Sequence, residues 1–176
     1  ISIYDTITCT GKFDLVEKDN PINCWIYSAA DGWGSHGPET LETAIRDSCN
    51  FYFNTVGYYL GQNENGEYVG DMTLLNKYAE MYGFDSTSGI EISEMDPQIA
   101  TADPTRAAMG QSNNAFTTSQ LARYVTTLAN SGTCYDLTLL DKITDASGNT
   151  QEEPDPLVHN RLELPQDLWT TIHAGM

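Results

Sequence analysis

The chain has 176 residues, of which 40% are hydrophobic and 19% are charged, a composition that supplies one domain-sized core and is unlike that of a disordered polyampholyte. Its 25 acidic residues outnumber its 8 Lys and Arg residues, and the net charge is −17. Such a surface repels phosphate backbones and anionic lipid, so we expect no nucleic-acid partner, and no apolar run reaches the roughly 18 residues of a membrane-spanning helix.

The first part of the chain, residues 1–38, is rich in Gly, Asn, Asp and aromatic side chains. The stretch "TITCTGKF" contains β-branched residues typical of strands, and Thr10-Gly11 fits a turn. Residues 1–38 are therefore expected to form short strands and loops.

Helical spacing of apolar residues begins in the next part, residues 39–133. We expect helices at Leu41–Ile45, at Phe51–Gly61, between Asp71 and Gly83, and between Thr117 or Thr118 and Gly132. In the last of these, an apolar stripe at i, i+3, i+4, i+7 and i+8 runs from Leu121 to Ala129. These residues form the expected helical body.

The last part, residues 134–176, is expected to contain an extended segment and a terminal helix. The polar stretch "DASGNTQEEPDP" fits the tip of a hairpin, and a helix is expected from Pro165 to His173. The whole chain is therefore predicted to be an α+β fold dominated by helices.

Three polar residues, Ser48, Cys49 and Asn50, join the first two expected helices. A Ser and an Asn two positions apart can project into one cleft, where the hydroxyl relays a proton and the amide both donates and accepts hydrogen bonds. Taken alone, however, Asn50 is explained more simply as the N-cap of the second helix. A Ser-His-Asp triad is disfavoured, because the only adjacent Ser-His pair is Ser35-His36 and sequence neighbours rarely form the required hydrogen bond.

Two longer blocks carry a resemblance to a known family. They are "HGPETLETAIRDSCNFYFNTVGYYLG" (36–61) and "AAMGQSNNAFTTSQLARYVTTLANSGT" (107–133). In order and spacing they resemble the transpeptidase domain of penicillin-binding proteins, most closely the class B enzymes of the elongation type. The resemblance covers most of residues 1–176. It implies the helical portion of the serine transpeptidase/β-lactamase-like fold, with its sheet missing or partial.

The family uses three motifs, S-x-x-K, S-x-N and K-T-G. Only the second is found here, as Ser48-Cys49-Asn50, because no Ser is followed three residues later by Lys and K-T-G does not occur. The resemblance implies a peptidoglycan D,D-transpeptidase that cross-links stem peptides and binds β-lactams. We expect the 176 residues alone to be inactive, because they resemble the segment between the nucleophile motif and K-T-G.

The resemblance also assigns roles to two catalytic residues. Ser48 would join the proton relay between the nucleophile's lysine and the leaving nitrogen, and Asn50 would bind the amide of the peptide or antibiotic. Cys49, between them, is then expected to point into the body of the protein. One departure is Ser112 in "MGQS", where the family usually has Gly.

Cys9, Cys24, His36 and Cys49 form a donor set suited to structural zinc. Some elongation-type relatives have a metal site behind the S-x-N motif, which favours this interpretation by resemblance. A Cys9–Cys24 disulfide with Cys49 buried, or four unrelated thiols, are the alternatives. Cys134 is expected to be a free thiol on a strand.

The resemblance also implies a cellular location and partners for the protein. The resemblance places the protein on the outer face of the bacterial cytoplasmic membrane, with its anchor outside the 176 residues, beside the elongation machinery. An incomplete sheet would leave apolar surface uncovered, so self-association is expected. The alternatives are a non-catalytic β-lactam sensor, a peptidoglycan-binding module, or a secreted structural domain with zinc.

Overall fold

The computed structural model describes residues 2–176 and shows an α+β fold with more helix than strand. The helices are α1 (Leu41–Arg46), α2 (Asn50–Leu60), α3 (Thr73–Met81), α4 (Pro104–Ala107), α5 (Thr118–Ala129) and α6 (Gln166–Gly175). The strands are β1 (Ile7–Cys9), β2 (Lys12–Phe13), β3 (Ile22–Asn23), β4 (Gly37–Glu39), β5 (Thr133–Tyr135), β6 (Ile143–Thr144), β7 (Thr150–Glu152) and β8 (Val158–Arg161).

The strands pair only in twos. The four antiparallel pairs among the described residues are β1–β4, β2–β3, β5–β8 and β6–β7. The expected partial sheet is therefore confirmed. Within residues 2–176, no helix is both long and apolar enough to cross a bilayer.

The chain packs as two compact units. The first contains the residues up to Lys77, 100–114 and 164–176, and the second contains 78–99 and 115–163. In the first unit, α1 packs against α6 and α2 packs against α4. Gly57 permits the second contact, because a Cβ there would lie 2.2 Å from the Pro104 carbonyl oxygen.

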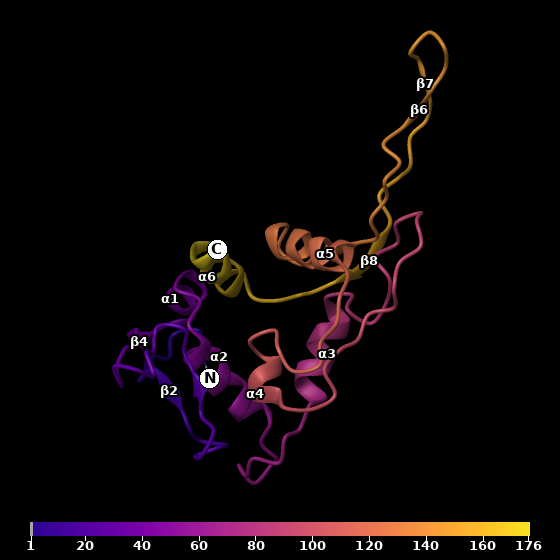
Figure 1. Cartoon of the computed structure of the whole chain (residues 1–176). Coiled ribbons are helices and arrows are strands. Elements are labelled where there is room, and N and C mark those ends of the chain that lie inside the picture. The colour runs from indigo at the N-terminus through magenta and orange to yellow at the C-terminus, as the bar shows by residue number, and fades with distance from the viewer. Residues whose placement is uncertain (1) are drawn as a thin grey trace. The chain divides into compact units, whose positions relative to one another are not determined.

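The core of the first unit lies beside the N-terminal end of α2. Cys9, Cys24, Ala44, Cys49 and Tyr52 are all at most 2% exposed and form one buried cluster. Strands β1 and β4 bring the N-terminal segment against this helix, and Figure 1 shows β4, α1 and α2 following one another along the chain around this region. Three of the five core residues are cysteines, so three thiol groups lie close together in this core.

In the second unit, α5 presents a polar face inward. Gln120, Arg123 and Thr127 are at most 1% exposed, whereas Leu121 and Val125 are 45% and 49% exposed. The apolar stripe predicted along this helix is thus only partly buried, because the buried side is occupied by the Arg123 guanidinium and its carbonyl partners. Apolar surface therefore remains exposed on α5.

The predicted hairpin is also present. Strands β6 and β7 close around Asp145, whose Oδ1 accepts hydrogen bonds from the backbone N–H groups of Ser147 and Asn149, each at 2.9 Å. Figure 1 shows this hairpin at the end of an arm that leaves β5 and β8. The turn is an Asx-type turn, as the Asp-Ala-Ser-Gly-Asn sequence favours.

Candidate functional site

The geometry of Ser48 is determined by how α1 ends. The Ser48 N–H donates to the Ile45 carbonyl at 3.2 Å and the Cys49 N–H donates to the Ala44 carbonyl at 2.9 Å. With Asp47 as the C-cap, these two bonds form a Schellman motif. Ser48 occupies the left-handed position of that motif, with φ 51°. Glycine usually fills this position, because the left-handed region costs other residues roughly 1–2 kcal/mol.

Cys49 is buried as expected, but of the two predicted catalytic residues only Ser48 lines the groove described below. Ser48 is exposed, Cys49 is 0% exposed and Asn50 is half-buried. The N-cap of α2 is Cys49, which makes no side-chain capping bond, and Asn50 is the first helical residue. The simpler explanation of Asn50 as an N-cap is therefore wrong.

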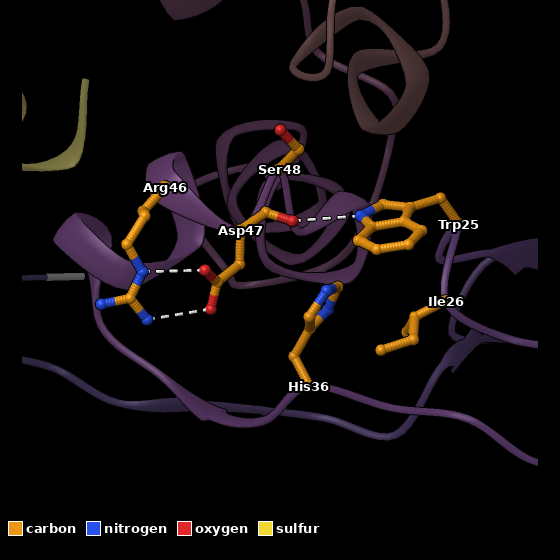
Figure 2. Close-up of a pocket in the computed structure, with 6 residues that line it drawn as sticks. All are labelled: Trp25, Ile26, His36, Arg46, Asp47 and Ser48. Atoms are coloured by element: carbon orange, nitrogen blue, oxygen red, sulfur yellow. Dashed lines mark hydrogen bonds and ion pairs between the residues drawn. The ribbon is translucent and has the colours of Figure 1, made fainter.

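Ser48 borders a groove. Its other lining residues are Trp25, Ile26, His36, Arg46 and Asp47. In Figure 2 the Ser48 hydroxyl points away from the His36 ring, while the Trp25 indole lies beside the Asp47 backbone. A hydroxyl at the edge of an open groove is accessible to a ligand in that groove.

A charged pair lies directly before Ser48. The Arg46 guanidinium donates from Nε to Asp47 Oδ1 at 2.8 Å and from Nη2 to Asp47 Oδ2 at 3.1 Å. Hydrogen bonding to Arg46 lowers the pKa of the Asp47 carboxyl, against the opposing effect of desolvation. Arg46 is 59% exposed, so the pair adds little stability but keeps the Asp47 side chain on the solvent side of the loop.

The structure brings together the four predicted metal donors. The donor atoms of Cys9, Cys24, His36 and Cys49 all lie within 4.8 Å of one another, and the three cysteines are buried. His36 Nδ1 lies 3.7 Å from the Cys9 sulfur and 3.5 Å from the Cys24 sulfur. Around a tetrahedral zinc ion, with Zn–S about 2.3 Å and Zn–N about 2.0 Å, sulfur and nitrogen would be about 3.5 Å apart.

The thiols of this cluster are unpaired with one another. Cys9, Cys24, Cys49 and Cys134 are all free, and Cys134 lies on β5, away from the other three in sequence. Burial raises the pKa of the Cys49 thiol, outweighing the backbone hydrogen bond from Tyr52, and the neighbouring Cys24 and Cys9 raise it further. Metal binding requires the thiolate, so a cation is the natural compensation for charge at this depth. This donor set fits zinc.

The structure also defines the conformation of Ser112, the residue found where the resemblance implies Gly. Ser112 adopts φ 67°, a conformation that favours Gly, and its hydroxyl donates to the Ala102 carbonyl at 2.8 Å. Asn113 and Asn114 then accept hydrogen bonds from the N–H groups of Thr101 and Ala100. The loop that the family usually forms with Gly is therefore held here by side-chain hydrogen bonds.

Sequence reasoning assigned no role to Arg46 or Asp47, and for the exposed aromatic residues Trp25 and Trp33 it favoured packing against the loop over lining the groove. Trp25 lines the groove and binds the Asp47 carbonyl, and Asp47 binds Arg46. His159 and His173 are exposed and lie outside the cluster.

Comparison with known proteins shows the family of the chain. The family model "Penicillin binding protein transpeptidase domain" matches residues 11–176. Penicillin-binding protein 2A of Bacillus subtilis is 25% identical over 192 residues of alignment, covering 94% of this chain and 26% of that protein. The chain thus spans about a quarter of this curated relative's length.

Solved structures give the same fold. Penicillin-binding protein 2B from Streptococcus pneumoniae matches with a TM-score of 0.75 and 25% identity, over 99% of this chain and 30% of that one. A complex between a penicillin-binding protein and MreC from Helicobacter pylori matches with a TM-score of 0.70 and 17% identity, over 100% of this chain and 30% of that one. The latter likeness concerns the fold alone.

Proposed function

The chain belongs to the penicillin-binding protein transpeptidase domain family, and we propose that it contributes the S-x-N corner of a serine-type peptidoglycan D,D-transpeptidase. In the longer protein, a serine outside these residues would attack the penultimate D-Ala carbonyl of a stem peptide, break the amide bond to the terminal D-Ala and release that D-Ala. The acyl group would then pass from the serine to an amine of a second strand. β-Lactams acylate the same serine. The proposal rests mainly on the family match over residues 11–176, which contains Ser48-Cys49-Asn50.

Ser48 and Asn50 carry the chemistry of this corner. The exposed Ser48 hydroxyl can accept and return a proton between the nucleophile's lysine and the leaving nitrogen. The Asn50 carboxamide can donate to and accept from an amide of the stem peptide or antibiotic. The burial of Cys49 supports this assignment, because it turns the intervening side chain away from the groove.

Cys9, Cys24, His36 and Cys49 would hold a structural zinc ion behind the motif. The ion would supply charge compensation for the thiolates and a cross-link between the N-terminal strands and the start of α2. With four protein donors it would leave no position for a substrate. Its contribution would be to preorganise the loop that carries Ser48.

The remaining proposals concern the context of the chain. It would act on the outer face of the bacterial cytoplasmic membrane, anchored through sequence outside these residues, beside the elongation machinery. The complex of a structural relative with MreC supports that last point. The 176 residues alone should form no acyl-enzyme, and the exposed Leu121 and Val125 should promote self-association, measurable by sedimentation.

A fluorescent penicillin tests the function. The longer protein should become covalently labelled, whereas the 176-residue chain should not. Ser48→Ala and Asn50→Ala should reduce the labelling rate of the longer protein by roughly two to three orders of magnitude, while a surface variant such as Thr126→Ala should not. A longer protein that is labelled but does not cross-link stem peptides would favour the sensor interpretation, and one that forms no penicillin adduct would favour a structural zinc domain.

A further inference from the structure

Trp25 contacts one of the four predicted metal donors, His36, and the loop that carries Ser48. Its indole Nε1–H donates to the Asp47 carbonyl oxygen at 3.0 Å, and its ring lies edge-on to the His36 ring, with centroids 5.4 Å apart. Trp25 directly follows Cys24, and Asp47 directly precedes Ser48. One hydrogen bond, drawn in Figure 2, therefore joins the two segments.

The carbonyl that Trp25 binds belongs to the end of a helix. The last carbonyls of a helix have no partner within it. In α1, the N–H groups of Ser48 and Cys49 satisfy the Ile45 and Ala44 carbonyls, and Trp25 satisfies that of Asp47. Because a peptide unit is planar, fixing the Asp47 oxygen also fixes the plane that leads into Ser48.

Ser48 needs such support more than an ordinary residue does. Its φ of 51° lies in the left-handed region, which an L-residue leaves readily unless its surroundings hold it. Cys49 holds the loop from the buried side, and Trp25 holds it from the groove side.

The exposure of Trp25 shows that its main contribution is the hydrogen bond to Asp47 and not packing in the core. Its side chain is 63% exposed, so it contributes little buried apolar area. Trp33, at 73% exposed, is a comparable indole that lies outside the lining of the Ser48 groove. The two residues thus form a matched pair for experiment.

We propose that Trp25 is a positioning residue for Ser48, which it holds in the left-handed conformation through the Asp47 carbonyl. Only the purpose served by Ser48 rests on the proposed function; the restraint itself does not. In the longer enzyme, the restraint would keep the Ser48 hydroxyl in one orientation and remove a loop rearrangement from the acylation step.

The first test uses the unaltered chain, labelled with ¹⁵N. Trp25→Phe and Trp33→Phe assign the signals of these two residues among the three indole N–H signals of the chain. The Trp25 N–H should exchange with solvent roughly five- to tenfold more slowly than that of Trp33, as expected for one hydrogen bond on an exposed ring. Equal exchange rates would overturn the proposal.

The second test measures the restraint on Ser48. In Trp25→Phe, the backbone amides of Ser48 and Cys49 should shift and exchange roughly five- to tenfold faster, while Trp33→Phe leaves them unchanged. The thiolate-to-cobalt absorption of the Co²⁺-loaded chain should persist in Trp25→Phe, since no donor has been removed. Unchanged Ser48 and Cys49 amides, or changes spread evenly over the chain, would overturn the proposal. Penicillin labelling is not used here, so its failure would count only against the proposed function.

Discussion

Two regions of the molecule bury polar groups, and they do so differently. Around Arg123 in the second unit, the guanidinium is 1% exposed and donates to the carbonyls of Gly83, Ser86 and Thr87. Around Cys49 in the first unit, four donors of the type that bind metals converge. The first region is stabilised by hydrogen bonds within the chain, whereas the second is suited to a cation. A chelator should therefore destabilise the second region and leave the first unchanged.

The largest expected effect is the loss of a metal ligand. Cys49→Ser should reduce the bound zinc to well below one ion per chain and lower the free energy of unfolding by about 5 kcal/mol, because metal binding and folding are coupled. Zinc content and denaturant unfolding measure both. Cys134→Ser is the matched control, since Cys134 is also 0% exposed but lies outside the cluster. Equal zinc content in the two variants would contradict the metal site.

The next effect concerns the internally bonded region. Arg123→Ala should destabilise the chain by about 3–5 kcal/mol, because it leaves the carbonyl partners of a buried cation unpaired. Adding a chelator should change the free energy of urea unfolding by the same amount in this variant as in the parent chain. Arg161→Ala, at an exposed position, is the control. If Arg123→Ala costs no more than the control, the described hydrogen-bond network is incorrect.

A smaller effect in the same unit depends on pH. Although desolvation raises it, the pKa of Glu94 falls to about 2, because the hydroxyls of Ser119, Thr117 and Ser88 and the Ser88 N–H donate to the carboxylate. A lowered pKa adds stability above the unfolded value near 4.5, and that stability is lost as the pH falls toward 2.

Thermal unfolding between pH 2 and pH 6 measures this dependence. Glu94→Gln should flatten it and cost about 1–2 kcal/mol at pH 6. Glu152→Gln, on the exposed hairpin, should do neither. A parent chain whose stability is flat from pH 4.5 to 2 would refute the role of Glu94.

The smallest effect is expected at Ser112. Ser112→Gly relieves a left-handed conformation worth about 1 kcal/mol but removes the hydrogen bond to Ala102 and adds freedom to the unfolded chain. The two changes should nearly cancel, within about 0.5 kcal/mol. Gly110→Ala, at φ 82° with open space around its Cβ, isolates the conformational cost. Strong destabilisation by Ser112→Gly would show that the hydrogen bond dominates.

The sequence predicted the elements whose signals are local. Thr117 caps α5, with a capping box to Gln120, and α2 ends at Gly61 as expected. The convergence of Cys9, Cys24, His36 and Cys49 was predicted from residue chemistry together with the family resemblance, although spacing alone favoured no metal motif.

The sequence could not predict features that depend on long-range packing. The Schellman end of α1 was hidden because Ser48, not Gly, occupies its left-handed position. The bond from Trp25 to Asp47 joins residues 22 positions apart. On α5, apolar periodicity favoured burial of Leu121 and Val125, but the inward face carries Arg123, whose partners come from distant loops. No local pattern encodes these contacts.

The metal content of the 176-residue chain, purified without added zinc, tests the central claim most directly. Elemental analysis together with thiol titration should find about one zinc ion per chain and four thiols that react once the protein is unfolded in chelator. A metal-free chain with two thiols fewer would show a disulfide in place of the metal site and contradict the account of how Ser48 and Asn50 are held.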